Sequence, residues 1–158
     1  MSSYQNGYKM RALKEHIEAC VGKQIATRFD AEMTDVSLKL SPKNMGNGFD
    51  LLYQKYKAEF YFDRFPFKKY NPAILFANVG AWLLDNDDER FETNELTDPD
   101  IDVVLEDEDN AEVLIIIEFE EPVKIVEAEN GEIHWRGKRW KIAEYEVWVA
   151  QRLKDVVI

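Results

Sequence analysis

Cysteine is nearly missing from this sequence of 158 residues, since Cys20 is the single thiol. One thiol cannot close a disulfide within the chain, and a structural zinc site needs several cysteine or histidine ligands. A disulfide-stapled fold and a cysteine–zinc scaffold are therefore excluded, and a reducing compartment is favoured.

Long hydrophobic runs are also lacking. The longest apolar stretch, residues 73–84, has ten apolar side chains in twelve positions, whereas a membrane-spanning helix needs about 20. Residues 1–8 contain no basic region followed by an apolar run, so we expect no secretory signal. The sequence predicts a soluble protein with no membrane partner.

Positive charge is scarce. Lys and Arg total 20 against 31 Asp and Glu, which makes this an acidic protein with a net charge of −11. Residues 85–109 alone hold thirteen acids and one base, Arg90. Binding to phosphate backbones or anionic lipids depends on Lys and Arg displacing counterions. Free nucleic acid, including any specific nucleotide sequence, is therefore not an expected partner.

Apolar and aromatic side chains are abundant. Hydrophobic residues make up 46% of the chain and aromatic residues 13%, which is too much apolar material for a disordered chain. The length is typical of one globular domain. We therefore expect a flexible N-terminal segment over residues 1–9 and a single domain over residues 10–155.

Two segments carry helix signals. Apolar side chains recur at helical spacing over residues 10–21, and Gly22 favours a helix end at that point. Asn71 and Pro72 together predict a second helix, because the Asn side chain can cap it and proline suits its first position. This helix extends to about Leu84 and is apolar on nearly all sides, so we expect it to be central or covered by a partner.

Several segments carry strand signals. Residues 53–65 alternate between apolar and polar side chains, which predicts a strand. Residues 24–40 alternate more loosely, so we expect a strand followed by an ambiguous segment there, and then a loop over residues 41–48. Residues 101–106 and 112–120 form two extended runs joined by a hairpin tip at 107–110. The second of these runs is apolar on both faces, so we expect it at the centre of the sheet and covered on both sides.

The C-terminal third carries turn signals. Pro122 is expected to end or edge the central strand, and Asn130-Gly131 predicts a hairpin that pairs residues 123–129 with 132–136. Residues 144–153 suit a last strand, with a helix as the alternative. The element order predicts an α+β fold, with a mostly antiparallel twisted sheet and two or more helices packed on it.

Three patterns could carry chemistry, and each has a simpler structural interpretation. The acidic stretch 98–109 lacks the glycine and the final glutamate that a calcium-binding loop requires. Asp100, Glu121 and Lys124 resemble nuclease carboxylates beside a lysine, but the Glu–Lys spacing is one residue too long and puts the two on opposite faces of a strand. A histidine one turn before the cysteine lacks an orienting group and an oxyanion site. We predict no catalytic residue, no metal ligand, no cofactor and no enzymatic activity.

Two small clusters carry opposite charges. The acidic tip is formed by Glu106, Asp107, Glu108 and Asp109, and the basic cluster by Arg136, Lys138, Arg139 and Lys141. The basic cluster alternates with aromatic residues, so it could be a weak single-strand binding site or the solvated face of a hairpin. A third interpretation is a subunit interface, in which the basic cluster of one copy meets the acidic tip of the next. A head-to-tail contact of that kind builds a ring when its rotation closes.

The order and spacing of these segments resemble the tail completion protein R family of P2-like contractile-tailed bacteriophages and prophages, from about Met10 to Leu153. The resemblance is carried by the short first helix, the aromatic strand, the helix ending Ala81-Trp-Leu-Leu-Asp85, the hairpin and the terminal Glu146-Val-Trp-Val149 run. The aromatic strand reads Phe49-Asp-Leu-Leu-Tyr-Gln-Lys-Tyr-Lys-Ala-Glu-Phe-Tyr-Phe-Asp-Arg-Phe65, and the hairpin pairs Ile101-Asp-Val-Val-Leu105 with residues 113–121.

The resemblance implies a structural virion protein with a fold like that of tail terminators. Such a protein would cap the head-proximal end of the tail tube, stop tail polymerisation and prepare the joint to the head. Its expected partners are further copies of itself in a ring, expected to be a hexamer, together with tail-tube and head–tail neck proteins. Its expected locations are the host bacterial cytoplasm during assembly and then the virion tail. The family has no catalytic residues to carry over.

Two other functions remain open from the sequence. A small adaptor could bind another protein through an exposed sheet edge without forming a ring. An acidic metal-dependent hydrolase would be stabilised against heat by divalent ions.

Overall fold

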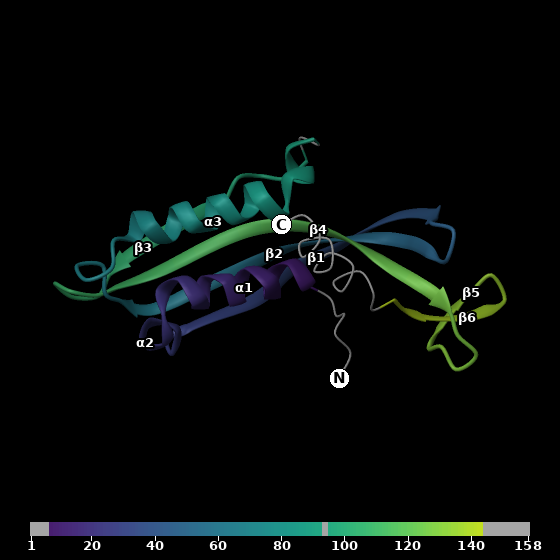
Figure 1. Cartoon of the computed structure of the whole chain (residues 1–158), viewed down its shortest axis with the longest axis horizontal. Helices are drawn as coiled ribbons and strands as arrows, with labels where there is room; N and C mark the ends of the chain where they lie inside the picture. Colours follow the sequence, from purple (N-terminus) through teal and green to yellow (C-terminus); the bar gives the residue numbers. More distant parts are fainter. Residues whose placement is uncertain (1–6, 93–94, 144–158) are drawn as a thin grey trace, which may run out of the picture. The chain divides into compact units, whose positions relative to one another are not determined.

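The computed structural model describes residues 7–92 and 95–143 (Figure 1). Its helical elements are α1 (Tyr8–Val21), α2 (Lys23–Ala26), α3 (Pro72–Asn86) and the 3-10 turn η1 (Asp88–Phe91). Its strands are β1 (Phe29–Asn44), β2 (Phe49–Phe65), β3 (Asp100–Leu105), β4 (Ala111–Glu127), β5 (Ile133–Trp135) and β6 (Lys138–Ile142). Of the helices that the structure describes, none is both long enough and apolar enough to cross a membrane.

These strands form one sheet in the order β1-β2-β4-β6-β5, with β3 paired to β4 beside this path. The β3–β4, β4–β6 and β5–β6 pairs are antiparallel. The α+β class with a mostly antiparallel sheet is therefore confirmed. The central position of the 112–120 strand is also confirmed, because β4 has β2, β3 and β6 as neighbours.

The chain forms two compact units. The described part of unit 1 comprises residues 7–8, Ser37–Lys55 and 120–143, and unit 2 comprises Lys9–Val36 and Tyr56–Phe119. The long strands β1, β2 and β4 contribute residues to both units. The single domain over residues 10–155 and the flexible segment 1–9 stay predictions.

Unit 2 has a large apolar core on one face of its sheet. Period-two alternation points Tyr56, Ala58, Phe60 and Phe62 of β2 to the same side, and all four are buried. The odd-numbered positions 113–119 of β4 are buried in the same cluster, together with Leu13 and Ile17 from α1 and Leu75 and Val79 from α3. Both helices therefore cover the same face of the sheet.

The predicted helix end at Gly22 and helix start at Asn71 are confirmed, whereas α1 begins earlier than predicted, at Tyr8, and α3 extends to Asn86. The start of the segment 24–40, predicted as a strand or an ambiguous segment, belongs to the short helix α2 instead. The first helix ends at Val21, and Gly22 follows with φ of 87°, a backbone angle that glycine adopts without strain. Asn71 caps α3, because its Oδ1 accepts a hydrogen bond from the Ala73 N–H at 3.0 Å. The apolar surface of α3 is only partly covered in the chain, since Ile74 and Leu84 are exposed.

The expectation that β4 is covered on both faces was wrong. Its odd-numbered side chains are buried, whereas Leu114 and Ile116 on the opposite face are half-buried. The helices cover one face only, so the second apolar face of this strand keeps access to solvent. Apolar side chains on both faces of a strand do not show whether the second face is covered by another part of the chain or lies at the surface.

Pro122 was expected to end or edge this strand, and the first of these alternatives was wrong, because β4 continues to Glu127. Proline lacks an N–H and is tolerated in a sheet where that donor is not needed. The registers pair β4 with β3 up to Ile116 and with β6 from Ile125, so Pro122 falls between the two paired stretches. The loop predicted from Ser41 likewise starts later, because β1 runs through Pro42 to Asn44.

The C-terminal hairpin is not the predicted one. Residues 125–127 pair with β6 rather than with 132–136, and the hairpin joins β5 to β6 through Arg136-Gly137. Both turn residues have positive φ, 55° and 70°, as a two-residue type I′ loop requires. Asn130-Gly131 forms a turn, with Gly131 N–H donating to the Ala128 carbonyl, inside the longer connection. The predicted last element, residues 144–153, lies outside the described residues.

Candidate functional site

The basic cluster lies on and beside the β5–β6 hairpin of unit 1. The tight turn places the Arg136 guanidinium 4.4 Å from the centre of the Trp135 ring and 5.3 Å from that of Phe49. Trp140 is buried, and its indole N–H donates to the Trp135 carbonyl at 2.8 Å. Edge-to-face and tilted contacts among Phe49, Trp135 and Trp140 therefore hold this hairpin and fix the direction of Arg136.

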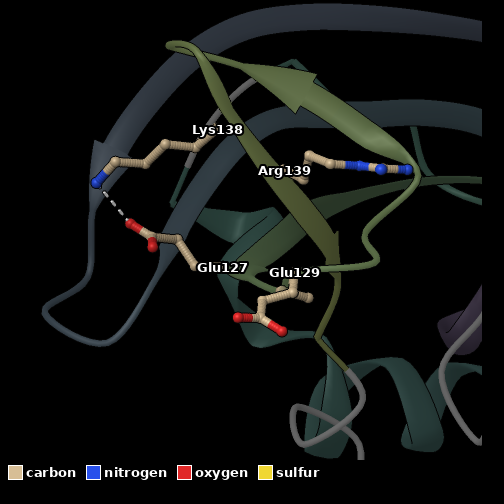
Figure 2. A pocket seen from close by; sticks show the side chains of 5 residues that line it. Glu127, Glu129, Lys138 and Arg139 are labelled. Atoms are coloured by element: carbon tan, nitrogen blue, oxygen red, sulfur yellow. Dashed lines mark hydrogen bonds and ion pairs between the residues drawn. The ribbon is translucent and has the colours of Figure 1, made fainter.

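The other members of the basic cluster differ in their availability. Figure 2 shows Lys138 reaching Glu127, with Nζ and Oε1 2.8 Å apart. Arg139 donates from Nε to the Gly131 carbonyl at 2.8 Å, which ties the hairpin to the preceding turn. An open depression of about 400 Å³ is lined by these residues with Ala128 and Glu129. Lys141 is exposed on β6 and, within the described residues, has no ion pair.

The acidic tip lies at the β3–β4 hairpin of unit 2. Asp107 Oδ1 accepts hydrogen bonds from the N–H groups of Asp109 and Asn110, each at 2.8 Å. The pKa of Asp107 is lowered below its ordinary value of 3.8, most strongly by the hydrogen bond from the Asp109 N–H. Hydrogen bonds from the side chain and the N–H of Asn110 lower it further. Asp107 is therefore a turn-forming residue whose carboxylate has a pKa below that of an ordinary aspartate.

The remaining residues of the acidic tip differ in whether contacts within the chain already occupy them. Glu106 accepts a hydrogen bond from the Arg64 N–H at 2.8 Å, and Asp109 lies 3.4 Å from Lys68. Glu108 is exposed, and within residues 7–92 and 95–143 it has no ion pair. Sequence reasoning located the tip but did not predict its partners Arg64 and Lys68, which come from the far end of β2 and the loop after it.

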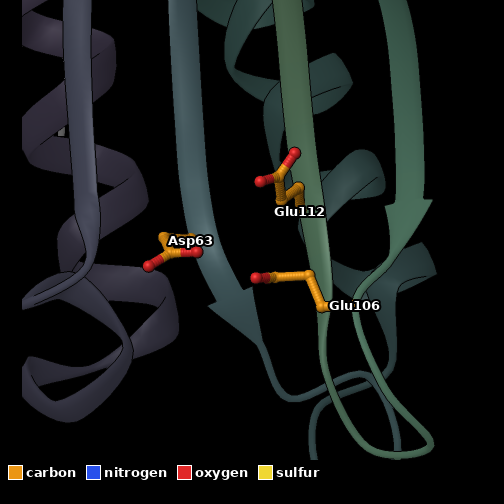
Figure 3. Close-up of side chains that lie close together, drawn as sticks. All are labelled: Asp63, Glu106 and Glu112. Carbon is orange, nitrogen blue, oxygen red and sulfur yellow. The ribbon is translucent and has the colours of Figure 1, made fainter.

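Three carboxylates meet beside the acidic tip. Asp63 of β2 and Glu112 of β4 converge with Glu106, and one oxygen of each lies within 4.8 Å of the others (Figure 3). Partial burial, a hydrogen bond with Glu112 and the charges of this cluster raise the pKa of Tyr61 above its ordinary value of 10. The cluster concentrates negative charge on the solvent side of the hairpin. Sequence reasoning missed Asp63 and Glu112 because strand pairing alone brings them to Glu106.

A buried charge network holds the C-terminal end of α3. Asp87 is 1% exposed in its side chain and accepts from Lys9 Nζ at 2.6 Å and from Arg90 Nη1 at 2.8 Å. Arg90 also donates to the Thr97 carbonyl at 2.9 Å and lies 5.8 Å from the centre of the Phe119 ring. Asp87 and Arg90 belong to the acidic segment 85–109, and both of these charges are buried and have a structural role.

The residues of the superficial nuclease pattern have other roles. Glu121 is buried and accepts from the Gly7 N–H at 3.0 Å, and Lys124 is buried with its Nζ 3.6 Å from Asp50 Oδ1. Asp100 is exposed on β3. Glu121 and Lys124 are both buried in separate contacts within the chain, and their expected position on opposite faces of the strand stays a prediction.

The cysteine and histidine of α1 form a local contact. His16 Nε2 lies 3.5 Å from Cys20 Sγ, one helical turn away. The Cys20 carbonyl accepts from the Tyr70 hydroxyl at 3.4 Å. These contacts support the interpretation of the pair as part of the packing between α1 and the loop before α3.

Comparison with known proteins identifies the family. The model described as "P2 phage tail completion protein R (GpR)" matches residues 7–145. An "Uncharacterized 19.2 kDa protein in rep-hol intergenic region" of Haemophilus phage HP1 (strain HP1c1) is 31% identical over 113 residues, or 71% of this chain and 66% of that protein. No solved structure matches. The chain therefore belongs to the P2 phage tail completion protein R family, a family with a structural role in the phage tail.

Proposed function

We propose that this protein assembles into a ring, expected to be a hexamer, at the head-proximal end of the phage tail tube. There it stops tube polymerisation and prepares the joint to the head, with tail-tube and neck proteins as partners. The observation that carries this proposal is the family match over residues 7–145. Assembly takes place in the host bacterial cytoplasm before the protein becomes part of the virion tail.

The distribution of charge supports self-assembly. Unit 2 holds 22 acidic and 10 basic side chains, a net charge of −12, whereas the described part of unit 1 holds 6 acidic and 8 basic side chains, a net charge of +2. Opposite charges on two units of the same chain favour contact of unit 1 in one copy with unit 2 in the next. An acidic inner surface would also repel passing DNA rather than bind it.

The charged subunit contact stays part of this proposal. The acidic tip of one copy faces the basic cluster of its neighbour, and Glu108 and Lys141 are its most available members. Membership of a structural tail family points to a non-enzymatic protein. Asp87, Glu121 and Lys124 support this, because buried contacts within the chain already occupy them.

Light scattering of the purified full chain tests the proposal. We expect a concentration-dependent shift from monomer to a closed oligomer at micromolar concentrations, and shorter tubes when the chain is added to polymerising tail-tube protein. A chain that stays monomeric at tens of micromolar and does not change tube length would contradict the proposal.

Charge reversal tests the contact itself. Lys141→Glu should weaken assembly, and Glu108→Lys in the same chain should restore part of it, because the reversed charges again attract each other across the interface. The matched control is Lys23→Glu on the exposed α2, which makes the same charge change outside both clusters. Equal assembly by Lys141→Glu and the unmodified chain would reject the contact.

An adaptor function is the second candidate, favoured by one observation. Strands β1 and β3 each present an outer edge to which no other described strand is paired. Such an edge can accept a strand from another protein. This function predicts a stable monomer that binds tail-tube or neck protein one to one.

A further inference from the structure

Two strands are exposed on both faces. The whole of β3 and the part of β1 from Val36 onward contain exposed residues only. Each presents three large apolar side chains at alternate positions: Val36, Leu38 and Leu40 in β1, and Ile101, Val103 and Leu105 in β3. Within the described part of the chain, β1 ends the strand order and β3 pairs only with β4. Unprotected apolar edges of this kind pair readily with another strand.

The backbone groups at these apolar positions point outward. The Met45 N–H donates to the Gly48 carbonyl where β1 turns into β2, and the Glu106 N–H donates to the Asn110 carbonyl where β3 turns into β4. Inward and outward backbone groups alternate along an antiparallel ladder. Counting back from each turn therefore places the outward groups of β1 at even positions and those of β3 at odd positions. Pro42 belongs to the outward series, where its missing N–H costs no bond to β2.

We propose that β1 of one copy pairs antiparallel with β3 of the next copy, with Leu38 opposite Val103. This register also places Val36 opposite Leu105 and Leu40 opposite Ile101, so three exposed apolar residues of each strand meet, while Val104, the fourth in β3, comes opposite Ser37. The outward backbone groups at positions 36, 38 and 40 then face those at 105, 103 and 101 and form the ladder, which ends before Pro42 and Pro99, an opposed pair with no N–H donor.

The same register pairs opposite charges at two positions. Lys39, which also interacts within its own chain, comes opposite Asp102, and Lys43 comes opposite Asp98 just before β3, whereas Asp35 comes opposite the like-charged Glu106. The parallel register that keeps Leu38 opposite Val103 places Lys39 opposite Val104 and Lys43 opposite Glu108 beyond the end of β3, so it has no pair of opposite charges within β3. Cross-strand pairs of opposite charge and of apolar residues both stabilise a sheet, so the antiparallel register is favoured.

These observations indicate that the partner of each exposed strand edge is a second copy of the chain. The residues of β1 from Ser37 onward belong to unit 1, with net charge +2 over its described part, and β3 belongs to unit 2, with net charge −12. The strand contact joins unit 1 of one copy to unit 2 of the next, but its register places Glu106 opposite Asp35 rather than at the β5–β6 hairpin, so it is an alternative to the contact of the basic cluster with the acidic tip. Both contacts are head-to-tail, as a ring requires. This inference rests on the proposed function and names the surface through which it operates.

Disulfide trapping tests the register. Ser37 and Val104 become a directly opposed pair without shared backbone hydrogen bonds, at a Cα separation of about 4.5 Å, which suits a disulfide. Full chains carrying Ser37→Cys and Val104→Cys, each with Cys20→Ser, are mixed and oxidised. We expect a mixed dimer, at least about tenfold more abundant than with Asp102→Cys, which opposes Ser37 in the parallel register. Equal or preferential trapping of the Asp102 variant would overturn the antiparallel register.

Substitution on the apolar edge tests the contact without a cross-link. Leu38→Asp should weaken association at least about tenfold, because it places a carboxylate opposite Val103. Leu84→Asp is the matched control, since Leu84 on α3 is 62% exposed against 60% for Leu38 and the charge change is the same. The control should stay within about twofold of the unmodified chain. Circular dichroism checks that both variants fold.

The outcomes separate this inference from the proposed function. Assembly and tube capping that survive Leu38→Asp, without trapping of the Ser37 and Val104 variants, would overturn the strand contact and leave the proposed function standing. Trapping of that pair by a chain that does not shorten tubes would support the contact and count against the proposed function. A monomer that gives no trapped pair, or that adds a tail-tube strand at β1 or β3 instead, would overturn the inference.

Discussion

Removing the charge of Asp87 should strongly destabilise the protein. Asp87→Asn keeps the size of the side chain but leaves Lys9 and Arg90 without their shared carboxylate, and their side chains are only 8% and 3% exposed. Removing one partner of a buried ion pair costs about 3–5 kcal/mol, because the remaining charges stay buried, and the exposed Glu89 carboxylate, 3.8 Å from Lys9 Nζ, offsets only part of this cost. The midpoint of thermal unfolding should fall by roughly 6–20 °C in a chain of this size.

Urea unfolding followed by circular dichroism measures this change in free energy. Asp88→Asn is the control, because Asp88 is exposed beside Asp87 and the same substitution there should change stability by less than about 0.5 kcal/mol. Adding Lys9→Met to Asp87→Asn should recover part of the loss, since one of the uncompensated charges is removed with it. A loss below about 1 kcal/mol for Asp87→Asn would refute the assignment of a buried charge network and indicate that water reaches Lys9 and Arg90.

Three further predictions concern the core, a helix cap and the acidic tip. Phe119→Ala should cost about 3–5 kcal/mol in urea unfolding, because Phe119 is fully buried against Tyr56 and Trp82; a loss under 1 kcal/mol would contradict that packing. Asn71→Ala should cost about 1 kcal/mol through loss of its bond to the Ala73 N–H, and Asn71→Asp should retain most of the stability. The carboxyl carbon of Asp107 should titrate in an NMR experiment with a midpoint below 3.8. Because folding lowers the pKa of Asp107, the stability contributed by its carboxylate is complete above the ordinary pKa and is lost as the pH falls through the pKa of the folded state. A midpoint above 3.8 would contradict the turn geometry.

Local chemistry made much of the fold predictable. The cap at Asn71, the helix end at Gly22 and the alternation along β2 depend on neighbours within a few residues, and all three are confirmed. The hairpin tip at 107–110 is confirmed for the same reason, because its turn bonds form within four residues. The family resemblance, carried by the order of these segments, is confirmed by the match over residues 7–145.

Competition between turns could not be resolved from the sequence. Asn130-Gly131 has the stronger local hairpin signal, yet the β5–β6 hairpin forms at Arg136-Gly137. Pairing there buries Trp140 against Trp135 and Phe49, and that energy comes from rings far apart in the sequence. A propensity that favours one turn by a small amount is outweighed when the other turn assembles an aromatic cluster.

The sequence by itself determined where α1, α3, β2 and the β3–β4 hairpin form, which face of β2 is apolar, and that the negative charge is concentrated in residues 85–109. Only the tertiary structure decided which of those charges is buried, as with Asp87, which carboxylates meet, as with Asp63 and Glu112, and which apolar strands remain uncovered. The physical reason is the distance along the sequence over which each interaction acts. Backbone propensity and capping act over a few residues, whereas desolvation and ion pairing depend on what the fold brings near each side chain.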